Sequence, residues 1–257
     1  MSFWENKIVL LTGASSGIGE ALVLVMAERG ATLGLVARRE ELLKTIKGKI
    51  EQNGGTARYF VCDVTEKEKL FEAAESLRNE FGKIDIMIAN AGIGGNNKAI
   101  RNLEADAVAK VININLLGAV NSVAAVLPKM LEQKSGQLVA VSSLAGIRGL
   151  PKSAAYSASK AGMTAFFESV RLDVQHKGVA VTVIQPGFIK TPLTSGRASK
   201  MPFIMELEDS IPLFLNAIEN QKKFAAFPWQ LATFVSLGRI FPAWLYDKIA
   251  DRARYRE

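Results

Sequence analysis

Residues 7–19 read KIVLLTGASSGIG and join a short apolar run to a turn that contains three glycines. After the turn, Ala21, Leu22, Val25 and Met26 recur at the spacing of an amphipathic helix. This order of strand, glycine-rich turn and helix is typical of phosphate binding, because glycine lets the backbone approach a pyrophosphate and a helix N-terminus offers unpaired N–H groups. The glycine spacing is G-x-x-x-G-x-G, and a tight turn with an ordinary helix cap is the alternative interpretation.

Short apolar runs alternate with helix-length segments along most of the chain. The runs are nearly continuous, as expected of parallel strands that are covered on both faces. The alternation predicts an α/β fold: a Rossmann-like, doubly wound, mostly parallel sheet of about seven strands with helices on both faces. The predicted strands are 7–11, 32–36, 57–61, 84–89, 137–141, 179–184 and 224–227. The predicted helices are 18–29, 39–52, 66–80, 102–132, 155–176 and 206–220, with one or two more within 229–254.

The composition is that of one globular domain. Hydrophobic residues make up 49% and charged residues 22% of the 257 positions, so we expect a single domain over residues 1–257. Residues 193–257 are expected to form a substrate loop and an apolar C-terminal extension of that domain. The net charge of +7 is spread along the chain, which argues against nucleic-acid binding and suits an anionic cofactor. A single cysteine, Cys62, and the lack of a signal-like start predict a cytoplasmic protein.

The end of the second predicted strand favours one nucleotide. Folds that select NAD usually carry an acid about 20 residues after the glycine-rich turn. This region reads VARRE over residues 36–40, so two arginines stand where an acid would be expected. A guanidinium binds a 2′-phosphate through charge-assisted, often bidentate hydrogen bonds. We therefore predict NADP (NADPH) as the cofactor, with Arg38 and Arg39 as phosphate ligands; solvated surface charges are the alternative.

Metal-dependent and hydrolytic chemistry are poorly supported. His176 is the only histidine and Cys62 the only cysteine, so no zinc ligand set is available and no metal is predicted. A Ser-His-Asp hydrolase would depend on His176, and no G-x-S-x-G motif accompanies it.

Further motifs follow the glycine-rich turn in order: Asp63-Val64, Asn90-Ala91-Gly92, Asn115, Ser142-Ser143, Tyr156-x-x-x-Lys160, and Pro186-Gly187 with Thr191. With these motifs the chain resembles the short-chain dehydrogenase/reductase family over residues 7–191. The resemblance implies an oxidoreductase acting on CH–OH and C=O groups, with Ser143, Tyr156 and Lys160 in catalysis and Asn115 completing a tetrad. The predicted cofactor contacts are Gly13, Ser15, Ser16, Gly17, Ile18, Gly19, Arg38, Arg39, Asp63, Val64, Asn90, Ala91, Gly92, Tyr156, Lys160, Pro186, Gly187, Ile189 and Thr191.

The chemistry of the three catalytic candidates agrees with this reading. Hydride transfer to a carbonyl leaves negative charge on oxygen, which needs a proton donor, and a tyrosine with a pKa of about 10 is protonated at neutral pH. Lys160 stands one helical turn after Tyr156, where its ammonium would lower the pKa of the phenol. Ser143, at the end of a predicted strand, would polarise the substrate oxygen. Taken singly, an exposed Tyr–Lys helix pair and a strand-end serine are ordinary features.

The C-terminal extension is apolar and then basic. The common biosynthetic members of the family carry a Gly-Gly pair in the last strand, whereas this chain reads FAAFPW over residues 224–229. It is more similar to the branch that acts on lipophilic carbonyls. Three interpretations of the tail stay open: packing on the core or a second subunit, shaping a hydrophobic substrate entrance, and attachment to a membrane surface.

We therefore predict an NADPH-dependent carbonyl reductase or alcohol dehydrogenase for a lipophilic ketone or aldehyde. The resemblance also implies a homo-oligomer, and the tail would place the protein at the periphery of a membrane if it binds lipid. A catalytically idle NADP-binding or scaffold protein of the same fold is the alternative from another class. An epimerase or a dehydratase is the alternative within the family.

Overall fold

The computed structural model describes residues 2–94, 104–195 and 201–252. Within these residues seven strands form one sheet, and every pairing between neighbouring strands is parallel. The strands are β1 (Ile8–Thr12), β2 (Thr32–Ala37), β3 (Thr56–Val61), β4 (Ile86–Ala89), β5 (Gly136–Val141), β6 (Val179–Pro186) and β7 (Phe224–Phe227). Their order across the sheet is β3-β2-β1-β4-β5-β6-β7. The predicted doubly wound, parallel α/β fold is confirmed.

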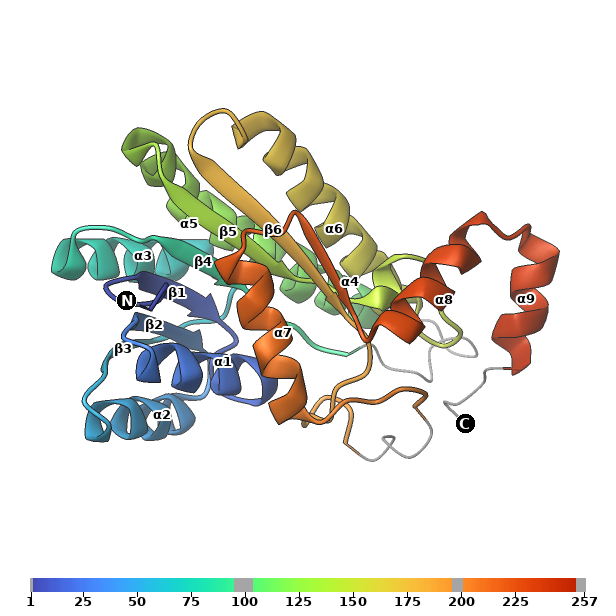
Figure 1. Ribbon diagram of the computed structural model, residues 1–257, viewed down its shortest axis with the longest axis horizontal. Helices are drawn as coiled ribbons and strands as arrows, with labels where there is room; N and C mark the ends of the chain where they lie inside the picture. Colours follow the sequence, from blue (N-terminus) through green and yellow to red (C-terminus); the bar gives the residue numbers. More distant parts are fainter. Residues whose placement is uncertain (1, 95–103, 196–200, 253–257) are drawn as a thin grey trace.

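Helices cover both faces of the sheet (Figure 1). Side chains of α1, α2 and α7 form one buried apolar cluster with the sheet, and those of α3, α5 and α6 form the other. The helices are α1 (Gly17–Glu28), α2 (Glu40–Gln52), α3 (Lys67–Phe81), α4 (Ala105–Ile112), α5 (Gly118–Gln133), α6 (Ala154–Val174), α7 (Leu207–Glu219), α8 (Trp229–Ile240) and α9 (Ala243–Arg252).

The continuous apolar runs follow from this layering. In β1, Val9 and Leu11 point into the cluster with α1, whereas Ile8 and Leu10 point into the cluster with α3. All five residues of β1 are buried, because successive side chains of a strand face opposite sides and both sides are covered.

The predicted helix 102–132 contains a change of helical geometry. The structure divides its described part into α4, a π-helical turn at Asn113–Leu117 (η1), and α5. The stretch Ala105–Gln133 is long and apolar enough to cross a membrane, judged by length and composition alone. An 18-residue segment within it has a mean hydropathy of 1.6, and half of that segment is buried inside the protein. In the fold it packs against α3, β4, β5 and α6, so its apolar character is that of a core helix.

The direction of winding reverses beside β1. This strand pairs with β2 on one side and with β4 on the other, and the chain reaches β4 only after β2 and β3. At such a switch point the loops after neighbouring strands diverge and open a crevice at the carboxyl ends of the strands. The fold therefore places a binding site where β1 and β4 end.

Candidate active site

A cavity of about 540 Å³ opens at the carboxyl ends of the strands. Its size falls in the usual range for small-molecule and cofactor sites. All but two of the predicted site residues line it, and the exceptions are Gly19 and Asn115. Segments from β1 to α8, far apart in sequence, thus converge on one site.

The glycine-rich turn lies directly against the end of β4. Gly13 has φ 75°, and a Cβ built on it would lie 2.8 Å from Ala91 Cα, so only glycine fits this approach. The Asn90 amide donates hydrogen bonds to the Thr12 and Gly13 carbonyls at 3.1 and 3.2 Å. Asn90 therefore holds the turn in place as well as lining the cavity.

Gly19 supports the turn from behind. A Cβ at this position would lie 2.1 Å from the Gly13 carbonyl oxygen, and Gly19 does not line the cavity. Gly19 thus has a packing role in the turn, and its predicted contact with the cofactor stays a prediction. Among the described residues, no side chain caps the first turn of α1. Unpaired N–H groups and the positive end of the helix dipole therefore face the cavity, which fits a phosphate group.

The two arginines after β2 have different partners. Arg39 donates hydrogen bonds from Nη2 to Ser15 Oγ at 2.8 Å and to Ser16 Oγ at 2.7 Å. Arg38 pairs with Asp63 at 3.4 Å and has a side chain that is 58% exposed. The Arg39 guanidinium thus lies on the glycine-rich turn, while Arg38 lies at the outer rim of the cavity.

Asp63 is held in its ionised form. Burial opposes ionisation, but hydrogen bonds from the Thr65 backbone and hydroxyl, together with the Arg38 guanidinium, hold the pKa of the Asp63 carboxyl below its ordinary value. The anionic carboxylate therefore competes with any incoming phosphate for Arg38.

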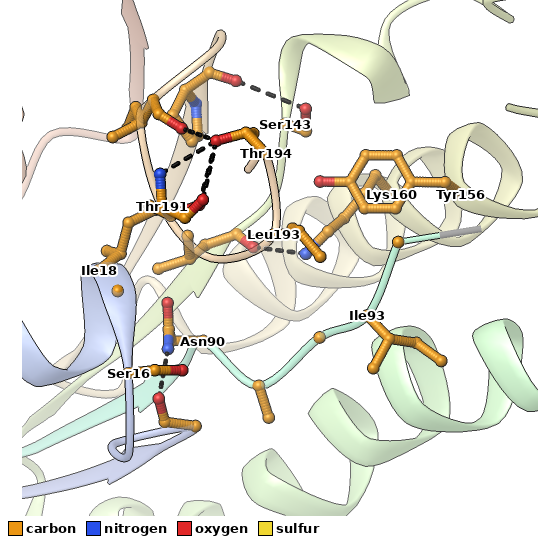
Figure 2. A pocket seen from close by; sticks show the side chains of 18 of the residues that line it. Ser16, Ile18, Asn90, Ile93, Ser143, Tyr156, Lys160, Thr191, Leu193 and Thr194 are labelled. Atoms are coloured by element: carbon orange, nitrogen blue, oxygen red, sulfur yellow. Dashed lines mark hydrogen bonds between the residues drawn. The ribbon is translucent and has the colours of Figure 1, made fainter. Parts of the chain in front are cut away.

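The three catalytic candidates come from β5 and α6 and meet on one side of the cavity. Ser143 follows β5, and its hydroxyl accepts from Ala145 N at 3.1 Å and donates to the Pro186 carbonyl at 3.4 Å. Tyr156 and Lys160 lie on α6, with Lys160 Nζ 5.9 Å from the centre of the Tyr156 ring. Figure 2 shows Tyr156 pointing its hydroxyl into the cavity.

Lys160 carries an amine that the fold has removed from water. Nζ donates a hydrogen bond to the Val141 carbonyl at 2.8 Å. Burial lowers the pKa of Lys160 to about 8, because the charged form loses its hydration. At neutral pH Lys160 is therefore mostly charged, and the burial of this charge lowers the free energy of unfolding.

Asn115 lies in the π-helical turn, fully buried and behind the cavity wall. Its Oδ1 accepts from Ile93 N at 2.8 Å, and its Nδ2 donates to the Ile93 carbonyl and to Ser159 Oγ, each at 3.0 Å. Asn115 thus ties the loop after β4 to the helix that carries Tyr156 and Lys160. This geometry makes it a positioning residue, in keeping with its predicted support of a kinked helix.

The sequence reasoning missed most of the apolar wall. Ile93, Leu144, Leu150, Phe188, Leu193, Met201, Leu231 and Val235 also line the cavity. They come from loops and from α8, and no motif marks them. The apolar periodicity of the tail was the one available signal, and two of its members, Leu231 and Val235, reach the cavity.

The tail also packs on the core. Leu231 and Ala232 are buried in a small cluster with Leu144, against which Phe188 and Val235 pack. The same helix thus packs on the core and lines the cavity, and a role of the tail in substrate entry stays a prediction. The basic end of the tail, with Arg254 and Arg256, lies outside the described residues. In the part of the chain that the structure describes, no three His, Cys, Asp or Glu side chains are grouped to hold a metal ion.

Replacing Gly19 with alanine should disturb the glycine-rich turn. Since the added methyl group would overlap the Gly13 carbonyl, we expect Gly19→Ala to weaken binding of a reduced nicotinamide dinucleotide about tenfold or more, measured by fluorescence titration. Gly48→Ala is the matched control: Gly48 also lies in a helix, but nothing lies within 4 Å of an added Cβ. Unchanged affinity in Gly19→Ala would contradict the packing argument.

Replacing Lys160 with methionine should stabilise the protein at neutral pH. Folding moves the Lys160 pKa from 10.5 to about 8, so the unfolded chain binds more protons between these values and wild-type stability rises with pH there. We expect Lys160→Met to raise the free energy of unfolding by about 1–3 kcal/mol at pH 7. The gain should shrink as the pH approaches 10. Urea unfolding of both proteins at several pH values measures it, and a gain independent of pH would refute the assigned cause.

Comparison with known proteins agrees with the geometry. The family model described as short chain dehydrogenase matches residues 7–202. An uncharacterized oxidoreductase from Myxococcus xanthus is 42% identical over 254 residues, covering 99% of this chain and 100% of that protein. A 3-oxoacyl-[acyl-carrier-protein] reductase from Thermotoga maritima is 37% identical, covering 74% of this chain and 77% of its own.

A solved structure shares both the fold and a substantial part of the sequence. The crystal structure of NAD+-bound xylitol dehydrogenase is 34% identical, with a TM-score of 0.68, and covers 73% of this chain and 72% of that chain. Residues 7–202, which the family model matches, include the glycine-rich turn, the end of β5 and the part of α6 that carries Tyr156 and Lys160. The chain belongs to the short-chain dehydrogenase/reductase family and is an oxidoreductase of that type.

Proposed function

We propose that this protein is an NADPH-dependent carbonyl reductase, and in the reverse direction an alcohol dehydrogenase, for a lipophilic ketone or aldehyde. The observation that carries the proposal is the convergence of Ser143, Tyr156 and Lys160 on the cavity that also contains the glycine-rich turn. The cytoplasmic location and the homo-oligomeric state implied by the family resemblance stay predictions.

Ser143, Tyr156 and Lys160 have different roles in the reduction of the substrate carbonyl. NADPH, when bound, supplies a hydride to the carbonyl carbon. Tyr156 donates its phenolic proton to the carbonyl oxygen as negative charge develops there. Ser143 turns its hydroxyl proton from the Pro186 carbonyl, 3.4 Å away, to the same substrate oxygen and stabilises that charge. The Lys160 ammonium, held by Val141 and close to the ring, stabilises the phenolate that remains.

Preference for NADPH rests on this chain's own residues. The related xylitol dehydrogenase is NAD+-bound, so family membership alone does not select the nucleotide. In this chain β2 ends at Ala37 and the next two residues are the cavity-lining Arg38 and Arg39. Both can meet a 2′-phosphate, Arg39 from the glycine-rich turn and Arg38 by exchanging Asp63 for the phosphate.

A lipophilic substrate fits the wall opposite the glycine-rich turn. Leu144, Leu150, Leu231 and Val235 lie on the side of the cavity formed by η2 (Leu144–Gly146), the loop before α6, and α8. Such a wall binds apolar carbon chains or rings and offers little to a polyol.

The direct test is NADPH oxidation with a panel of ketones and aldehydes of increasing apolar size. We expect one NADPH to be consumed for each carbonyl reduced, with kcat/KM rising with apolar size. NADPH binding without turnover of any carbonyl would favour a catalytically idle protein. Product formation without net NADPH oxidation would indicate an epimerase or a dehydratase.

Removing the proton donor should separate binding from chemistry. We expect Tyr156→Phe to lower kcat at least about hundredfold while the NADPH dissociation constant changes little, because the phenyl ring keeps its packing but has no proton to give. Tyr59→Phe is the control and should keep wild-type kinetics. Tyr59 lies on β3, and its hydroxyl bonds Glu40 rather than any of the three catalytic candidates. A wild-type rate in Tyr156→Phe would refute the assigned acid.

The nucleotide preference should depend on the arginines. We expect Arg38→Ala to weaken NADPH binding about 10- to 100-fold and NADH binding much less, since a charge-assisted hydrogen bond contributes on the order of 1.5–3 kcal/mol. Titration of both nucleotides measures the difference. Arg29→Ala, which removes an exposed arginine paired with Glu219, is the control. Equal weakening of NADPH and NADH would undo the 2′-phosphate assignment.

A further inference from the structure

Helix α8 buries one apolar face and exposes further large apolar side chains. Leu231, Ala232 and Gly238 are buried on the face that packs against the molecule. On the other face Phe234, Leu237 and Ile240 are 54%, 49% and 77% exposed. The exposed surface of α8 also carries Gln230, Thr233 and Ser236, so it is mixed in character. Three large apolar side chains exposed together on one helix nevertheless indicate an interaction surface.

Two tryptophans and two basic residues frame this outer face. Trp229, at the start of α8, is 72% exposed, and Trp244, in α9, is 65% exposed. Arg239 and Lys248 are exposed on the same two helices. Helix α8 carries no acidic residue, whereas α9 carries Asp247 and Asp251. Tryptophan rings with basic neighbours around an apolar face are typical of segments that lie in the headgroup region of a membrane.

The α8–α9 hairpin extends beyond the end of the sheet (Figure 1) but is firmly attached. Arg148 Nη1 donates hydrogen bonds to the Gly238 and Phe241 carbonyls, the latter at 3.0 Å. The Arg148 guanidinium also lies 3.9 Å from the centre of the Tyr246 ring, and Tyr246 Oη donates to the Gly149 carbonyl at 2.5 Å. These contacts join the hairpin to the loop that leads to Tyr156.

The same helix separates the exposed face from the cavity. Leu231 and Val235 line the cavity from the inner face of α8. The outer apolar face is therefore one helix diameter, roughly 10 Å, from the substrate space. A surface that contacts the outer face is therefore separated from the cavity by this one helix.

We propose that the α8–α9 hairpin docks on an anionic lipid surface, with Phe234, Leu237, Ile240 and the two tryptophans in the headgroup region, so that the cavity takes its carbonyl substrate from the membrane. The exposed tryptophans with the nearby cations Arg239 and Lys248 favour a lipid surface as the partner, because indole rings and basic side chains both suit the headgroup region of an anionic membrane. The net charge of +7 adds a long-range attraction to such a surface. The docking itself stands on the hairpin alone, and only the substrate route rests on the proposed function.

The test uses the full chain with NADPH and vesicles of phosphatidylcholine with or without phosphatidylglycerol. We expect co-sedimentation with the anionic vesicles that weakens as salt is added. Brominated lipid should quench tryptophan fluorescence, and since Trp4 is fully buried the quenching reports Trp229 and Trp244. Phe234→Ser combined with Ile240→Ser should lower the partition coefficient about tenfold or more.

The matched control is Leu42→Ser combined with Leu172→Ser, which removes two exposed apolar side chains from α2 and α6. It should bind vesicles as the wild type does. For the Phe234/Ile240 double variant we further expect a lower kcat/KM toward a vesicle-borne long-chain ketone and an unchanged value toward a short water-soluble one.

Failure to bind anionic vesicles, or equal loss of binding in the control, would overturn the proposal. A dimeric wild type that the Phe234/Ile240 variant converts to a monomer, with no vesicle binding by either, would assign the face to a second copy instead. Absence of NADPH turnover in free solution would remove the proposed function but would leave the vesicle-binding result standing.

Discussion

The close contact between the glycine-rich turn and the end of β4 is the constraint on which the rest of the site depends. Gly13 touches Ala91 with no room for a side chain, and the Asn90 amide bonds two carbonyls of the turn. Gly19, in the first turn of α1, packs against the Gly13 carbonyl and likewise leaves no room for a side chain. Because β1 and β4 are neighbours at the switch point, this contact sets both the floor of the cavity and the direction of the α1 N-terminus.

A second constraint is the burial of Lys160, which the fold sustains at a cost. The amine is desolvated and donates hydrogen bonds to the Val141 carbonyl and to the neighbouring Met163 sulfur. Asn115, Ser159 and Ile93 hold the surrounding loop and helix rigid. A site that keeps a buried cation in place sacrifices stability for electrostatic preorganisation, which is a common trade in enzymes.

The convergence of Ser143, Tyr156, Lys160 and most predicted cofactor contacts on one cavity could be expected from the sequence, because the chemistry dictates their residue types and spacing. Two of the predicted residues lie outside the cavity lining: Gly19 packs against the turn, and Asn115 bonds the loop after β4 to α6. The different partners of Arg38 and Arg39 could not be foreseen, since they depend on where Asp63 and the serines of the turn lie. The apolar wall also escaped prediction, because its members share no pattern and meet only in three dimensions.

By itself the sequence determined the parallel α/β sheet, the order of its elements and the motifs of the dehydrogenase site. Local periodicity and turn chemistry encode these features, so they can be read one segment at a time. Only the tertiary structure decided that α8 forms a wall of the cavity while presenting a second apolar face outward. Which apolar side chains of such a helix are covered depends on what the rest of the chain packs against it, and no local pattern contains that information.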